Sequence, residues 1–288
     1  MQANIKHFYH KQSWTYSYVV SDPETKQCAI IDSALDFNYG TGKVSTEAAD
    51  TIAAYIEAEE LTVEWILETH AHADHLSGAH YLKEKLGGKI AIGEHICEVQ
   101  EVFKGVFNLE KNFAVDGSQF DHLFTDREVF SIGNLKVEVL HTPGHTPACV
   151  SYLMDGLVFV GDTVFMPDAG SARCDFPGGD ANALFKSVKK LLALPEQTQL
   201  YMCHDYAPEE AVVGPRWVTT VGEERAYNKH VHDGISEERF VEMRTARDEV
   251  LPMPKLILPA IQINIRAGAL PEEEGNGVSY LKLPLNQF

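Results

Sequence analysis

One short segment limits what this chain can fold into more than any other. Four side chains of metal-binding type, His70, His72, Asp74 and His75, fall within six positions, directly after an apolar run at residues 63–67 that fits a buried strand. Imidazoles two positions apart in an extended or turn segment can converge on one ion, and the carboxylate and third imidazole can reach a neighbouring ion or a bound water. A lone histidine in a loop is usually a solvated residue, but this density of ligands favours a metal site at the end of a strand.

Three further side chains of this type lie at the ends of predicted strands. His145 follows an apolar run at residues 135–140, Asp162 ends the second arm of a predicted hairpin, and His204 ends the predicted strand at residues 199–203. Each signal is weak alone, because a histidine at a strand end is more often an ordinary hydrogen-bonded residue and a Gly-Asp pair is usually a turn. Together they place two imidazoles and a carboxylate at the same end of separate strands, where functional groups tend to gather.

The order of the predicted elements indicates an α+β fold in which two sheets pack together and helices cover them. The strands come in two groups with helices interleaved, and Asp155-Gly156 gives the second group a strong hairpin turn. Asp180 and Ser236 suit the N-caps of two helices. The predicted strands are residues 17–20, 28–31, 63–67, 89–92, 135–140, 149–154, 157–160 and 199–203, and the predicted helices are residues 46–58, 78–86, 180–192 and 236–250.

The chain is short enough to form one large domain. Its 288 residues contain no repeat, low-complexity tract or linker that would divide them. We therefore expect a single domain over residues 1–288, with a core at about 1–206 and a C-terminal extension over 207–288 that wraps the core. Prolines at positions 252, 254, 259, 271 and 284 argue against long regular elements in that extension.

Charge and cysteine content limit the partners and the compartment. With 42 acidic and 24 basic residues the formal net charge is -18, and such a field repels polyanions, so no nucleic-acid partner is expected. Five cysteines without a disulfide-like spacing favour a reducing cytosol, so we expect a cytoplasmic protein. The N-terminus lacks the apolar segment of a signal peptide, and no apolar run approaches the roughly 20 residues that span a membrane.

The order of the candidate ligands is that of a known family. The set His-x-His-x-Asp-His, then a histidine, an aspartate and a histidine, resembles the metallo-β-lactamase superfamily over about residues 65–206. The resemblance implies a metallo-β-lactamase αββα sandwich, with a metal held by His70, His145 and Asp162 at the edge between the two sheets. The residues that match the ligands of two-metal members are His70, His72 and His145 for one ion, Asp74, His75 and His204 for the other, and Asp162 as the bridge.

A loop after Asp162 separates two branches of the superfamily. Its Arg-x-Asp-Phe element at residues 173–176 resembles the persulfide dioxygenases (sulfur dioxygenases), whereas glyoxalase II enzymes, their closest hydrolytic relatives, tend to carry Lys-Phe there. The stretches HTPAC at residues 145–149 and HDY at residues 204–206 also resemble the dioxygenases. Two residues depart from the pattern, because Ala148 stands where the dioxygenases have glycine and Cys174 where many have threonine.

The dioxygenase resemblance implies a reaction and a cofactor. Glutathione persulfide, or a related persulfide, would be oxidised with O₂ to sulfite and glutathione at one non-haem Fe(II) ion per chain. Two histidines and one carboxylate are the ligand set of such oxygenases, and a persulfide sulfur is soft enough to bind iron. The other four candidates, His72, Asp74, His75 and His204, would then orient ligands and bound water through hydrogen bonds.

The residues leave a second class of enzyme open, because every ligand of a two-metal site is present. In this alternative two zinc ions would lower the pKa of a bridging water, and the resulting hydroxide would hydrolyse a glutathione thioester, as in glyoxalase II. A third alternative is a metal-binding regulatory or scaffold protein without activity. The intact ligand set disfavours it.

Glutathione carries two carboxylates, so its binding to an acidic protein needs donors beside the metal. We expect Arg173, in the loop next to the site, and Tyr206, which the resemblance implies, to bind substrate. Arg216 and Arg266 in the extension are further candidates, although a solvated surface role is the simpler interpretation of each. The role of Cys174 stays open. The resemblance also implies a homodimer.

Overall fold

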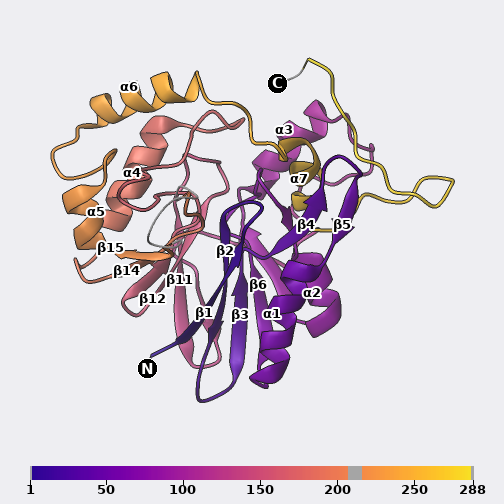
Figure 1. Cartoon of the computed structure of the whole chain (residues 1–288), viewed down its shortest axis with the longest axis horizontal. Helices are drawn as coiled ribbons and strands as arrows, with labels where there is room; N and C mark the ends of the chain where they lie inside the picture. Colours follow the sequence, from indigo (N-terminus) through magenta and orange to yellow (C-terminus); the bar gives the residue numbers. More distant parts are fainter. Residues whose placement is uncertain (1, 207–215, 287–288) are drawn as a thin grey trace.

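The computed structural model describes residues 2–206 and 216–286, which form a four-layer αββα sandwich (Figure 1). Two six-stranded sheets make the inner layers. The core between them combines side chains of both sheets, such as Tyr18 and Leu67 from one and Val137 and Tyr152 from the other. The α+β sandwich of two helix-covered sheets that we predicted from the sequence is confirmed.

The two sheets are built from consecutive halves of the chain. In spatial order, the first contains β1 (Asn4–His10), β2 (Thr15–Ser21), β3 (Gln27–Ile31), β6 (Thr62–Leu67), β8 (Lys89–Gly93) and β9 (His122–Phe124). The second contains β10 (Val129–Ile132), β11 (Leu135–His141), β12 (Val150–Met154), β13 (Leu157–Phe159), β14 (Gln199–Tyr201) and β15 (Val218–Thr220). A small third sheet joins β5 (Lys43–Ser45), β4 (Ala34–Asn38) and β7 (Leu76–Ser77).

Helices cover the outer face of each sheet. The first sheet is covered by α1 (Glu47–Ala58), α2 (Ala79–Leu86), α3 (Ile96–Val106) and α7 (Ile257–Asn264), and the second by α4 (Ala181–Leu192), α5 (Val221–Tyr227) and α6 (Glu237–Asp248). Successive side chains of a strand point to opposite faces. In β3, Cys28 and Ile30 therefore pack toward the helices while Ala29 and Ile31 face the second sheet. Burial on both faces explains why such strands are continuous apolar runs.

The two predicted N-caps are confirmed, but three helices were not predicted. The carboxylate of Asp180 accepts hydrogen bonds from two backbone N–H groups of α4, and the hydroxyl of Ser236 accepts one at the start of α6. The unpredicted helices are α3, α5 and α7. In α7, Pro259 lies in the first turn, where a backbone N–H has no partner within the helix, so it does not prevent a short helix from forming.

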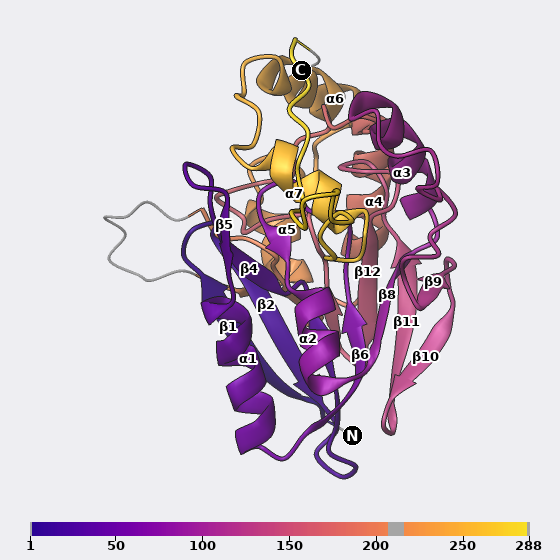
Figure 2. The ribbon, with the colours of Figure 1, turned by 90° about the vertical axis from the view of Figure 1, so that its right-hand side faces the viewer.

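The C-terminal part of the described chain contacts both halves of the sandwich. It adds β15 to the edge of the second sheet and packs α6 against α4 (Figure 1). It then returns to the first sheet, where α7 contacts β7 and is seen above α2 in Figure 2. The expected boundary at residue 207 falls at the start of residues 207–215, outside the described residues, so the division into core and extension stays a prediction. Within residues 2–206 and 216–286, every helix is too short or too polar to span a bilayer.

Candidate metal centre

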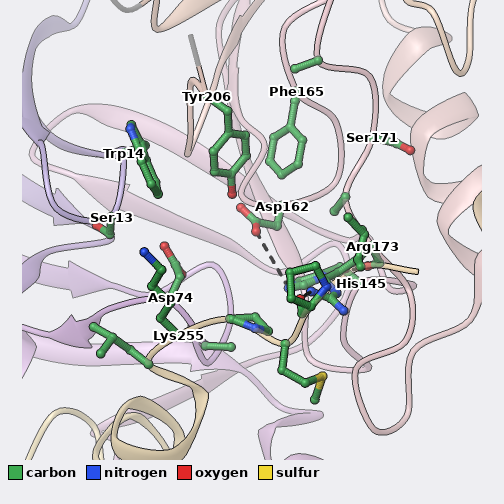
Figure 3. A pocket seen from close by; sticks show the side chains of 18 of the residues that line it. Ser13, Trp14, Asp74, His145, Asp162, Phe165, Ser171, Arg173, Tyr206 and Lys255 are labelled. Atoms are coloured by element: carbon green, nitrogen blue, oxygen red, sulfur yellow. Dashed lines mark hydrogen bonds and ion pairs between the residues drawn. The ribbon is translucent and has the colours of Figure 1, made fainter. Parts of the chain in front are cut away.

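The histidines and aspartates that we singled out in the sequence meet at one edge of the sandwich. His70 lies beyond the end of β6, His145 beyond β11, Asp162 beyond β13 and His204 beyond β14. Strands of both sheets end at this edge, so residues far apart in the sequence come together there. Asp74, Asp162 and His145 are seen around the same opening in Figure 3.

One cluster consists of His70, His145 and Asp162. Oδ2 of Asp162 lies 3.9 Å from Nε2 of His70 and 3.8 Å from Nε2 of His145. Nδ1 of His145 donates to the backbone carbonyl of Arg173 at 2.8 Å, which leaves the lone pair of Nε2 free. Burial, followed by the charge of nearby His72, holds the pKa of His70 well below its usual value. A neutral imidazole is the form that binds metal.

A second cluster lies beside the first and shares Asp162 with it. Nε2 of His204 is 3.3 Å from Oδ1 of Asp162 and 3.6 Å from Oδ2 of Asp74. The hydroxyl of Thr15 lies 3.3 Å from Nδ1 of His75 and 3.4 Å from Nδ1 of His204, so it can orient both rings. Burial lowers the pKa of His75 to about 4 and keeps this ring neutral.

His72 is held by two carboxylates that the sequence analysis did not identify. Its Nε2 lies 3.0 Å from Oδ1 of Asp32 and 3.2 Å from Oε2 of Glu68. Burial opposes a charge on the ring, but the two carboxylates raise the pKa of His72 well above its usual value. When the ring is neutral, Nε2 keeps the proton that these carboxylates accept, so Nδ1 is the atom left for a metal ion. Asp32 also accepts hydrogen bonds from the backbone N–H and hydroxyl of Thr69. Asp32 comes directly after β3, as Asp162 comes shortly after β13. This position at a strand end could have marked Asp32 as a candidate site residue.

The free atoms at this edge fit metal ions. Five buried nitrogen and oxygen atoms of the two clusters and of His72 have no hydrogen-bond partner among the described residues: Nε2 of His70, Nδ1 of His72, Nε2 of His75, Oδ1 of Asp162 and Nε2 of His204. A buried polar atom without a partner is costly, and metal coordination removes that cost. Imidazole nitrogens and carboxylate oxygens suit iron and zinc alike, so these donors indicate a metal site without selecting the metal.

A cavity of about 890 Å³ opens onto the clusters. Asp74, His145 and Asp162 form part of its wall, and most of the remaining wall is apolar. Tyr206 and Phe165 lie next to each other on one side of Asp162, with ring centroids 5.5 Å apart (Figure 3). The Tyr206 ring also stacks on the His204 ring at 5.3 Å. The cavity is large enough for a small organic substrate.

The four predicted substrate residues are placed in different ways. Arg173 and Tyr206 line the cavity. Arg216 and Arg266 are not in its wall: Arg216 is paired with Asp168 and Asp205, and Arg266 with Glu110.

Arg173 itself is occupied within the protein. Its guanidinium donates to both carboxylate oxygens of Asp175, at 2.5 and 2.6 Å, and to the carbonyl of Pro252 at 2.7 Å. This pairing places the guanidinium in the cavity wall and ties the loop to the C-terminal segment. From the sequence we expected Arg173 to donate to substrate. Its pairing with Asp175, two positions away, depends on the conformation of the loop and could not be predicted from the sequence.

Three cations besides Arg173 lie in the cavity wall, and none was predicted from the sequence: Arg244, which is buried and paired with Asp248, Arg247 and Lys255. Arg247, at the end of α6, and Lys255, just before α7, both line the cavity. Neither forms an ion pair with a described carboxylate, in contrast to Arg173. Cys174, whose role we left open, is buried in the core that α4 and α6 share with the second sheet, and burial raises the pKa of its thiol above the usual value. No sequence pattern marks Arg247 or Lys255, since only the return of the C-terminal segment brings them here.

A sandwich of two helix-covered sheets with paired clusters of histidine and aspartate at one edge defines a metalloenzyme of the αββα class. The family profile described as "Metallo-beta-lactamase superfamily" matches residues 15–204. The chain belongs to this superfamily, as the order of its ligands indicated.

Individual relatives extend over nearly the whole chain. A protein of Dictyostelium discoideum named Glyoxylase B2 is 54% identical over 99% of this chain and 98% of its own length. A probable metallo-hydrolase of Burkholderia pseudomallei is 49% identical over 98% of this chain and 99% of its own. The mitochondrial persulfide dioxygenase ETHE1 of Bos taurus is 29% identical over 92% of this chain and 88% of its own. Among solved structures, ETHE1 of Myxococcus xanthus superposes with a TM-score of 0.74, at 29% identity, over 92% of this chain and 100% of its own.

Proposed function

We propose that this protein is a persulfide dioxygenase that oxidises glutathione persulfide, or a related low-molecular-weight persulfide, with O₂ to sulfite and the thiol. The observation that carries the proposal is the contact between the Arg-x-Asp-Phe element and His145. The backbone carbonyl of Arg173 accepts the hydrogen bond from His145 Nδ1, and the Phe176 ring lies 5.8 Å from the His145 ring. The element that resembles the dioxygenases thus contacts His145, a candidate metal ligand, directly.

The His70, His145 and Asp162 set would hold one Fe(II) ion, which supplies one-electron chemistry with O₂ when bound. The chain's own residues would perform the binding. The apolar wall excludes water from the reacting sulfur, and the Tyr206 ring limits the opening above Asp162. Arg247 and Lys255, the two wall cations without an ion pair to a described carboxylate, would receive the carboxylates of the thiol.

Hydrolysis of a glutathione thioester is the second candidate, and a specific observation favours it. The two oxygens of Asp162 point to different clusters, since Oδ2 faces His145 and Oδ1 faces His204. A carboxylate in this position can bridge two ions, and a two-metal site of the zinc type activates water for hydrolysis. The relatives at 49% and 54% identity carry hydrolase or glyoxylase names, which support this candidate more directly than the relative at 29% supports oxidation.

One experiment separates the two reactions. Protein purified without oxygen is assayed for iron and zinc per chain, for O₂ uptake with glutathione persulfide, and for hydrolysis of a glutathione thioester. About one iron per chain with persulfide-dependent O₂ uptake would support the dioxygenase. Two zinc ions per chain, thioester turnover and no O₂ uptake would reject it in favour of the hydrolase. Absence of both activities in metal-loaded protein would reject both candidates.

A further inference from the structure

A buried amide of the C-terminal helix α7 contacts the loop that carries three of the candidate ligands. Asn264, at the end of α7, is only 4% exposed. Its Nδ2 donates to the backbone carbonyls of His72 and His75, both at 2.8 Å. Its Oδ1 accepts from the backbone N–H of Ser77, also at 2.8 Å. Both donors of this amide and its acceptor are therefore used on one short segment, residues 72–77.

This segment needs such partners because it lacks regular structure. Residues 71–75 belong to no helix or strand, yet His72 and His75 are fully buried. Buried carbonyls must find a donor, and a segment outside a ladder cannot obtain one from a neighbouring strand. Asn264 supplies it to the two carbonyls that flank Asp74. The amide thus fixes the backbone from which His72, Asp74 and His75 project.

The helix that carries Asn264 is packed into the hydrophobic core. Ile257, Ile261 and Ile263 are buried in the core that α7 shares with the first sheet. Just beyond the helix, Gly268 has a φ of +85°, and a Cβ at this position would lie 3.0 Å from the carbonyl oxygen of Ser77. The end of α7 therefore packs directly on residues 72–77, the ligand loop. A shift of α7 would also shift this loop.

We propose that Asn264 is a positioning residue for the metal centre, and that α7 thereby sets the affinity and geometry of the site from outside the ligand set. The proposal rests on the assignment of a metal centre under the proposed function, but not on which reaction that centre performs. Residues that orient metal ligands through hydrogen bonds typically contribute about 10–100-fold to metal affinity. Asn264 acts one step further out, through the backbone of three candidate ligands together.

The same helix offers a matched control. Gln262, two residues earlier and 1% exposed, uses its amide in an analogous way on a different partner. Its Nε2 donates to the carbonyls of Leu258 and Lys282, and its Oε1 accepts from the backbone N–H of Lys282. Asn264→Asp and Gln262→Glu make the same chemical change, an amide NH₂ to a carboxylate oxygen, in the same helix. Only the first places that oxygen against the ligand loop.

The test is metal affinity of the full chain, measured with Co(II) and Zn(II) in competition with a chelator, together with the visible spectrum of the Co(II) form. Asn264→Asp is expected to weaken Co(II) binding by about tenfold or more and to alter the spectrum, because two carbonyls lose their donor. Gln262→Glu is expected to stay within about twofold of wild type, although its unfolding midpoint falls. Asn264→Ala provides a milder loss of the same donors if the aspartate variant does not fold.

Three outcomes count against the proposal. Equal losses of affinity in Asn264→Asp and Gln262→Glu would mean that α7 acts only through overall stability. An unchanged Co(II) affinity and spectrum in both Asn264 variants would reject the positioning role while leaving the metal centre intact. A wild-type chain that binds neither Co(II) nor Zn(II) would overturn the metal assignment itself, and with it the proposed function.

Discussion

Asp162 places its two carboxylate oxygens against different histidines. Oδ2 lies 3.8 Å from Nε2 of His145, and Oδ1 lies 3.3 Å from Nε2 of His204. One side chain therefore joins the two ligand clusters, and it belongs to the centre whether one ion or two are bound.

Replacement of Asp162 by asparagine should remove most of the bound metal. The amide keeps the shape of the side chain, but its NH₂ group cannot act as a ligand and faces a histidine nitrogen instead. We expect the metal content to fall by about tenfold or more, since loss of a ligand should exceed the effect of losing an orienting group. Elemental analysis of the purified variant measures this. The control is Asp168→Asn, which changes an exposed carboxylate paired with Arg216 and should leave the metal content unchanged. Full metal content in Asp162→Asn would contradict the assignment of Asp162 as a ligand.

Lys255 and Arg247 should affect substrate binding without affecting turnover. Both line the cavity, and neither is paired with a described carboxylate. An exposed charge contact contributes up to about 1 kcal/mol, so each alanine variant should raise KM for an anionic thiol substrate about two- to fivefold and leave kcat unchanged. Steady-state kinetics measures both constants, and higher salt should shrink the difference from wild type. Lys186→Ala, which removes an exposed lysine on α4, is the control. A fall in kcat at constant KM would argue against a binding role.

His230 should make the stability of the protein depend on pH. Burial, followed by the charge of Arg244, lowers the pKa of His230 to about 4, and its Nδ1 accepts a hydrogen bond from the backbone N–H of Ser171. The unfolded chain binds a proton near pH 6.5 whereas the folded chain does not. The stability contributed by neutral His230 is therefore complete above about pH 6.5 and is lost as the pH falls toward 4.

The size of this effect can be measured on metal-free protein. The fall in the pKa of His230 from 6.5 to about 4 corresponds to about 3 kcal/mol in total, of which about 2 kcal/mol is lost between pH 7 and pH 4.5. Wild type should therefore lose about 2 kcal/mol more stability over this interval than His230→Gln does. Urea unfolding at the two pH values gives the comparison. His80→Gln, at an exposed histidine of α2, should keep the wild-type pH dependence. Equal slopes in wild type and His230→Gln would exclude His230 as the cause.

Gly144 should tolerate no side chain, because the backbone before His145 passes α4 at close range. Its φ is +136°, and a Cβ there would lie 2.2 Å from the backbone nitrogen of Leu184. Gly144→Ala must displace either α4 or His145, so we expect a loss of stability of about 3 kcal/mol or more, together with weaker metal binding. Gly156 has a φ of +76° but nothing within 4 Å of the added Cβ, so Gly156→Ala should cost only about 1 kcal/mol. Similar losses in both variants would show that backbone strain, and not crowding, controls Gly144.

Much of the fold and of the centre could be predicted because their signals are local. A few consecutive residues are enough to predict the apolar strands β3, β6 and β11 and the helix caps Asp180 and Ser236. The candidate ligands follow such runs, and this position brought His70, His145 and Asp162 to a common edge. The helices α3, α5 and α7 were not predicted. Local signals existed for two of them, because the buried residues of α3 recur at helical spacing and Thr220 and Glu223 form a capping box at the start of α5. Short helices such as α5 and α7, with seven and eight residues, depend for their stability on packing against the rest of the molecule.

Which side chains of metal-binding type stand at the strand ends, and through them the class of fold, could be inferred from the amino-acid sequence. The residues that surround these side chains became known only from the three-dimensional fold. It placed Asp32 and Glu68 on His72, paired Arg173 with Asp175, kept Arg216 and Arg266 out of the cavity, and brought Lys255 into its wall. It also joined Asn264 to the loop that follows His72. These relations depend on backbone paths that cross the whole molecule and on the need of buried polar groups for partners, and neither is encoded in any short stretch of residues.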